Sequence, residues 1–166
     1  MSEQQDNEPD FRARAQPLPK GNCFEDMTEG RVFEHHWGRT ITDGDNATFT
    51  TQTLSFCPLY FNEPYAQSLG HPKTVVNPLL VFNTVFGLSV EDLSEGGGPF
   101  LGVDECEFCD NVYVGDTLTA RSTVVNARES KGRKGFGVVT WHTEGFNQRG
   151  DKVLDYHRTN LVRKRK

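Results

Sequence analysis

The sequence contains little cysteine: four residues of 166, at positions 23, 57, 106 and 109. So few thiols in a chain of this length do not make a disulfide framework. Cys106 and Cys109 form a CxxC pair, but no second ligand pair follows at a matching spacing. Residues i and i+3 of a strand also point to opposite faces. We therefore expect no metal, no cofactor, and reduced cysteines that serve as small apolar fillers.

The sequence also lacks an excess of positive charge, since 18 Lys and Arg against 23 Asp and Glu give a net charge of -5. Nucleic-acid binding depends on neutralising phosphates with a basic surface, so RNA and DNA are not expected partners. No apolar run approaches the roughly 18 residues of a membrane span, and the N-terminus MSEQQDNEPD is unlike a signal peptide. We expect a cytoplasmic protein without a membrane partner.

What the sequence does contain is enough chain to bury one core. Residues 1–21 are polar and proline-rich, which predicts a flexible N-terminal arm. Residues 22–166 then form one domain.

The first half of this domain predicts one strand and two short helices. The strand covers 31–42, and Thr42-Asp43-Gly44-Asp45 is typical of an N-cap region for a helix over 47–53. A loop at 57–62 leads to the second helix, over 62–69.

The strongest helical pattern covers residues 77–93. Asn77 is a good N-cap and Pro78 suits the first helical position, where its missing N–H costs nothing. The following turns are apolar nearly all round, which predicts a buried helix. The glycines and proline of 94–99 end it.

Beyond residue 99 the pattern changes to period two, with β-branched residues. It predicts four strands, near 100–110, 117–127, 136–146 and 151–162. Turn residues separate them. The chain therefore predicts an α+β domain in which one long buried helix packs against an antiparallel sheet.

Particular motifs add to this order of elements. They are GRTITDGD at 38–45 followed by Phe49-Thr50, PLYFN at 58–62 with Tyr65-Ala66, and VGDTL at 114–118. With them the chain, over roughly residues 22–163, resembles the MaoC-like acyl-CoA hydratases and dehydratases. It looks most like the mesaconyl-CoA hydratase and β-methylmalyl-CoA dehydratase branch, because of NQRGD at 147–151 and YHRT at 156–159.

This resemblance implies a hotdog fold and reversible addition of water to the double bond of an enoyl thioester. The pantetheine arm of the substrate would lie in a tunnel at a dimer interface. The reaction needs a base, an acid, and donors for the thioester oxyanion. The family supplies an Asp and a His five residues apart, and a backbone N–H at the start of the central helix.

The sequence departs from the family at all three places. Ser55 stands at the position of the Asp and Tyr60 at that of the His. Serine without a partner is a poor base, and tyrosine, with a reference pKa of about 10, suits an acid or a donor. Pro78 replaces the usual glycine and has no N–H. We expect the N–H groups of Leu79 and Leu80 to be unpaired and to serve the oxyanion instead.

Five other residues have two interpretations each, a role in the reaction or a purely structural or surface position. Asn77 can orient a water or the thioester, or act only as an N-cap. Asp45 is a displaced catalytic carboxylate or only a cap. His71 lies near the pocket mouth or on the surface, and at most one of His35 and His36 faces inward.

The turn between the second and third of these strands is basic and is a candidate for binding the phosphates of coenzyme A. A solvated turn explains it equally well. The residues of this basic hairpin are Arg128, Lys131, Arg133 and Lys134. The basic residues at 163–166 form a frayed tail or also pair with phosphate.

We interpret the chain as a homodimeric hydratase or dehydratase of a short acyl-CoA, including branched or dicarboxylic ones. The main alternative is a non-catalytic acyl-CoA-binding hotdog subunit that has lost the dyad and pairs with an active homologue as a heterodimer. The second alternative is an acyl-CoA thioesterase that uses Asp45.

Overall fold

The computed structural model describes residues 21–165, so all but the last residue of the expected N-terminal arm lies outside the described residues. The helices are η1 Phe24–Asp26, α2 Asp43–Gln52, η2 Pro58–Tyr60, α3 Glu63–Ser68, α4 Pro78–Leu88 and α5 Val90–Leu93. The strands are β1 Val32–Glu34, β2 Arg39–Thr40, β3 Phe100–Phe108, β4 Thr117–Glu129, β5 Phe136–Phe146 and β6 Lys152–Arg163.

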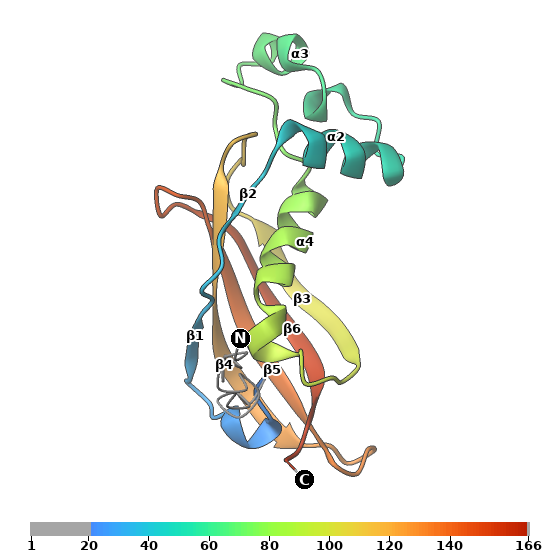
Figure 1. Ribbon diagram of the computed structural model, residues 1–166, viewed down its shortest axis with the longest axis vertical. Helices are drawn as coiled ribbons and strands as arrows, with labels where there is room; N and C mark the ends of the chain where they lie inside the picture. The colour runs from blue at the N-terminus through green and yellow to red at the C-terminus, as the bar shows by residue number, and fades with distance from the viewer. Residues whose placement is uncertain (1–20, 166) are drawn as a thin grey trace, which may run out of the picture.

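The strands form one antiparallel arrangement in the order β1-β4-β5-β6-β3, and β2 also pairs with β4. Helix α4 runs along one face of this sheet, while α2 and α3 gather at one end of the molecule (Figure 1). The predicted α+β class, with one main helix on an antiparallel sheet, is therefore confirmed.

The four predicted C-terminal strands are observed to within two residues at each end. Along β5 every second residue is buried, so the period-two pattern marks the face toward the helix. Gly115 and Gly150 have φ of 94° and 85° in the turns before β4 and before β6, a conformation that favours glycine.

The predicted helix over 77–93 is wrong in its continuity, because it breaks at Ser89 into α4 and α5. The hydroxyl of Ser89 donates to the carbonyl of Phe86 over 2.7 Å and accepts from Nη1 of Arg158 over 2.8 Å. The Arg158 side chain is buried, at 1% exposure, so its guanidinium needs acceptors from the helix side. Only the sheet side of α4 is fully covered, and Leu79 is 54% exposed.

The predicted strand over 31–42 is split into β1 and β2. Between them the ring of His35 turns inward to Asp92, at 2.7 Å, and to the hydroxyl of Ser122, at 2.9 Å. Helix α2 begins four residues earlier than predicted, because Thr42 and Asp45 cap it reciprocally. Helix α3 is observed as predicted, with Asn62 as its cap.

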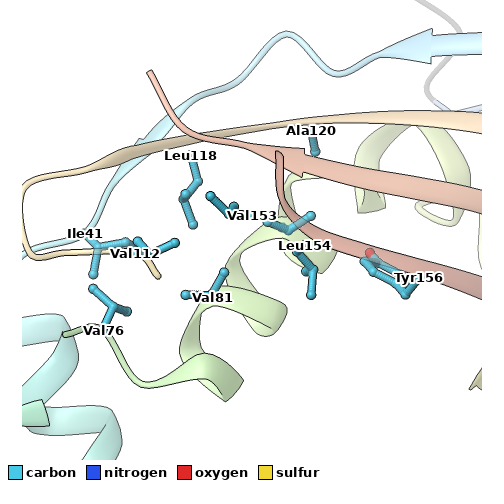
Figure 2. Close-up of a cluster of buried hydrophobic side chains, with 10 residues drawn as sticks. Ile41, Val76, Val81, Val112, Leu118, Ala120, Val153, Leu154 and Tyr156 are labelled. Carbon is cyan, nitrogen blue, oxygen red and sulfur yellow. The ribbon is translucent and has the colours of Figure 1, made fainter. Parts of the chain in front are cut away.

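The main core lies between α4 and the sheet (Figure 2). Val81 and Val85 of α4 contact strand residues such as Leu118, Val153 and Leu154 there. A second buried cluster, around Trp141 and Leu93, fills the other end of the sheet. Within residues 21–165, no helix has both the length and the hydropathy that crossing a membrane requires.

Candidate functional site

The candidate site is built where α2, the η2 loop and the start of α4 meet. Asn46 of α2 is fully buried and holds the three together. Its Nδ2 donates to the carbonyls of Tyr60, over 2.7 Å, and Val75, over 2.9 Å. Its Oδ1 accepts from the N–H of Asn77 over 2.8 Å. Sequence reasoning missed Asn46, because an asparagine inside a polar helix carries no pattern of its own.

The start of α4 is fully hydrogen-bonded. Oδ1 of Asn77 accepts from the N–H of Leu79 over 3.0 Å, and Nδ2 of Asn77 lies 3.4 Å from Oγ1 of Thr50. The N–H of Leu80 donates to the carbonyl of Asn77 over 2.9 Å. The expectation that the N–H groups of Leu79 and Leu80 are unpaired is therefore wrong, because the cap and a tight first turn use both. An oxyanion would have to displace the Asn77 side chain to reach Leu79.

Ser55 and Tyr60 lie on the loop that follows α2, and both are half-buried. The loop is held by backbone bonds, from the N–H of Ser55 to the carbonyl of Thr50 and from the N–H of Tyr60 to the carbonyl of Cys57. Burial raises the pKa of Tyr60 above its ordinary value. Its hydroxyl therefore keeps its proton at neutral pH and suits a donor or an acid rather than a base.

Asp45 is occupied as a helix cap. One carboxylate oxygen accepts from the hydroxyl of Thr42 over 2.7 Å and from its N–H over 2.9 Å, and the other accepts from Arg39 over 2.8 Å. The bonds from Thr42 and the charge of Arg39 lower the pKa of Asp45. These contacts favour the capping interpretation over that of a catalytic base.

The histidines do not converge on this loop. Nδ1 of His71 lies 3.2 Å from the hydroxyl of Tyr113, and Nε2 of His36 lies 3.7 Å from Glu91. His35 is buried and His36 exposed, as expected for neighbours in an extended segment.

The basic hairpin lies at the opposite end of the sheet from α2 and α3 (Figure 1). Strand β4 separates the two ends, and its 13 residues span roughly 40 Å at about 3.3 Å per residue. Within one chain the structure therefore does not bring the hairpin together with Ser55 and Tyr60. The guanidinium of Arg133 instead lies 4.6 Å from the ring centre of Phe136.

A hollow surface follows the exposed side of α4. A groove of about 420 Å³ lies between the helix and the segment around Trp37, lined by Leu80, Asn83, Thr84 and Leu88 among others. A second hollow shares Leu80 with it and reaches Asp45 and the start of α2. The α4 groove, meaning these two hollows, is largely apolar and open to solvent, and of the predicted catalytic residues Asp45 lines it.

Fold and surface together define a MaoC-like hotdog protein. A solved MaoC domain protein from Chloroflexus aurantiacus superposes with a TM-score of 0.84 at 41% identity, covering 92% of this chain and 43% of that one. A Mycobacterium tuberculosis protein described as a double hotdog fold gives a TM-score of 0.77 at 24% identity, over 87% of this chain and 45% of that one. The predicted hotdog fold is confirmed.

The chain belongs to the mesaconyl-CoA hydratase family, whose model matches residues 6–166. The β-methylmalyl-CoA dehydratase of Chloroflexus aurantiacus is 43% identical over 145 residues, which are 87% of this chain and 41% of that protein. The predicted family and branch are thus confirmed. The chain spans less than half the length of the curated relatives it matches.

Proposed function

We propose that this chain takes part in adding or removing water at the double bond of a short enoyl-CoA thioester, bound along the α4 groove. The match of residues 6–166 to the mesaconyl-CoA hydratase family carries the proposal. The names of the relatives favour a branched, dicarboxylic acyl group. The apolar α4 groove, which reaches from Trp37 to Asp45 at the start of α2, offers such a thioester a surface of suitable character.

In this proposal Tyr60 is the proton donor or orients the water, and Ser55 positions the same water. Neither is a base at neutral pH, because Ser55 has no activating partner within residues 21–165 and burial raises the pKa of Tyr60. The base would therefore come from a second hotdog unit, either another copy of this chain or a homologue. Exposed apolar residues on α4 and on the edge strand β3, namely Leu79, Phe100, Leu101 and Phe108, support such pairing.

A non-catalytic acyl-CoA-binding subunit is the second candidate. It is favoured by the hydrogen bonds that already use the N–H groups of Leu79 and Leu80.

The variant Asn77→Ala tests whether the thioester oxyanion binds at the start of α4. If it does bind there, the variant frees the N–H of Leu79 at a capping cost of about 1 kcal/mol. Turnover would then be kept or raised in Asn77→Ala, whereas a positioning role of Asn77 predicts a loss.

The basic hairpin can hold coenzyme A phosphates only for a substrate whose acyl group lies in another subunit, since it stands at the far end of its own sheet. Lys131→Ala with Arg133→Ala should then weaken binding of acyl-CoA but not of the matching acyl-pantetheine. Equal affinity of wild type and double variant for acyl-CoA would remove the phosphate assignment alone.

We also propose a cytoplasmic location, which the free thiols at positions 23, 57, 106 and 109 support.

The deciding experiment tests the purified protein against mesaconyl-CoA and a panel of short enoyl-CoA and hydroxyacyl-CoA thioesters. Chromatography measures the hydrated product, a thermal-shift assay measures binding, and light scattering measures mass. If the chain is a homodimeric enzyme, chromatography shows turnover and light scattering gives about twice the chain mass. A binding subunit gives stabilisation, about 2.7 kcal/mol at 100 times Kd, without turnover. Neither turnover nor stabilisation with any thioester would exclude both candidates.

A further inference from the structure

A histidine and two carboxylates meet on the face of the sheet away from α4. His142 and Glu144 are outward-facing residues of β5, and Asp155 is an outward-facing residue of β6. Glu144 pairs directly with Asp155 across the two strands, and His142 pairs with His157. One ring nitrogen of His142 and one oxygen of each carboxylate all lie within 4.8 Å of one another. All three side chains are half-buried.

We propose that His142, Glu144 and Asp155 bind one divalent transition-metal ion, with Zn²⁺ as the best fit. Tetrahedral Zn²⁺ takes imidazole nitrogen and carboxylate oxygen at about 2.0–2.2 Å, which sets its ligand atoms about 3.4 Å apart. Nε2 of His142 already lies 2.6 Å from Oδ1 of Asp155, so small side-chain rotations bring these two atoms to the spacing that Zn²⁺ requires. Mg²⁺ and Ca²⁺ prefer oxygen ligands throughout, so the imidazole argues against them.

The position for a cation is at present occupied by Lys152. Its Nζ lies 2.6 Å from Oδ2 of Asp155 and 3.7 Å from Oε1 of Glu144, so one ammonium bridges both carboxylates. Arg121 holds the other oxygen of Glu144 over 2.6 Å. The two cations balance the two carboxylates, so an ion has to displace the lysine. The Lys152 side chain is 41% exposed and can turn out to solvent.

A second imidazole stands next to the site. The ring of His157 stacks on that of His142 with centres 4.9 Å apart and planes inclined by 20°. Nδ1 of His157 lies 3.0 Å from a carboxylate oxygen of Glu105, which has a φ of 52° at an irregularity in β3. Because ligands come from β5 and β6 on the face away from Tyr60, the ion would clamp these strands and take no part in the proposed hydration.

The sequence-based expectation of no metal weighed His142 and His157 only as partners of the CxxC pair, for which neither is an obvious ligand. His142 and Asp155 are 13 residues apart and become neighbours only through the register of the β5–β6 hairpin. No spacing rule for zinc ligands covers such a cross-strand cluster.

Equilibrium dialysis against ZnCl₂ tests the site, in a Cys106→Ser, Cys109→Ser background that removes the exposed thiols nearest to it. We expect one ion per chain, bound at least about tenfold more weakly by His142→Ala. Lys152→Met keeps the apolar stem, removes the competing charge, and should tighten binding by about tenfold or more. The matched control, His36→Ala, removes an exposed histidine outside the cluster and should bind as the background does.

Two results would overturn the proposal. One is no Zn²⁺ binding in the background, and the other is His142→Ala or Lys152→Met with unchanged affinity. Far-UV circular dichroism of each metal-free variant checks that the sheet is intact. If His142→Ala does not fold, the response of Lys152→Met decides alone, because that residue is a partly exposed side chain at the strand end.

Discussion

Replacing Asn46 by alanine should loosen the candidate site and destabilise the whole domain. The change removes three hydrogen bonds, to Tyr60, Val75 and Asn77, at a fully buried position. At a net contribution of about 1 kcal/mol for each bond, the unfolding free energy should fall by about 3 kcal/mol. For a chain of this length that corresponds to a Tm lower by about 6–12 °C.

Urea unfolding followed by circular dichroism measures the first effect, and acyl-CoA affinity measures the second. Affinity should fall in conditions where the variant is still folded, because the Tyr60 loop has lost its tie to α2. Asn83→Ala is the matched control for stability alone, since exposed Asn83 also donates to a backbone carbonyl, that of Leu79, but lines the α4 groove. It should change stability by no more than about 0.5 kcal/mol. An Asn46→Ala loss as small as that of the control would refute the central role given to Asn46.

Three further changes test the site, the packing and the pH response. Tyr60→Phe should lower kcat of an active assembly about 10²-fold with KM nearly unchanged, and equal kcat would place the chemistry elsewhere. Gly145→Ala should cost about 1–3 kcal/mol in chemical denaturation, because its Cβ would lie 2.7 Å from a methyl carbon of Val85. Burial lowers the pKa of His35 below 6.5, against a carboxylate hydrogen bond that raises it. Since the unfolded chain then takes up the proton first, stability should fall as pH drops through about 6.5. His35→Gln should flatten that dependence in pH-stepped unfolding, whereas His36→Gln should not.

Much of the candidate site could be read from the sequence because it depends on local chemistry. Asn77 and Pro78 mark a helix start whatever packs against it, and the loop with Ser55 and Tyr60 follows α2 as predicted. The sequence did not show whether the backbone N–H groups at the start of α4 are free to bind an oxyanion. Whether the N–H of Leu79 is available depends on the rotamer of Asn77, which the contacts with α2 set.

The sequence by itself determined the four C-terminal strands, the glycine turns between them and the caps of α3 and α4, because period two, positive φ and unpaired helix-end donors act over a few residues. Only the tertiary structure decided the rest. The helix breaks at Ser89 because a guanidinium 69 residues away in the chain is buried against it. One side of α4 stays exposed because the sheet covers only the other. The cluster around His142 forms because the pairing of β5 with β6 sets Glu144 opposite Asp155, two residues that are 11 positions apart in the chain.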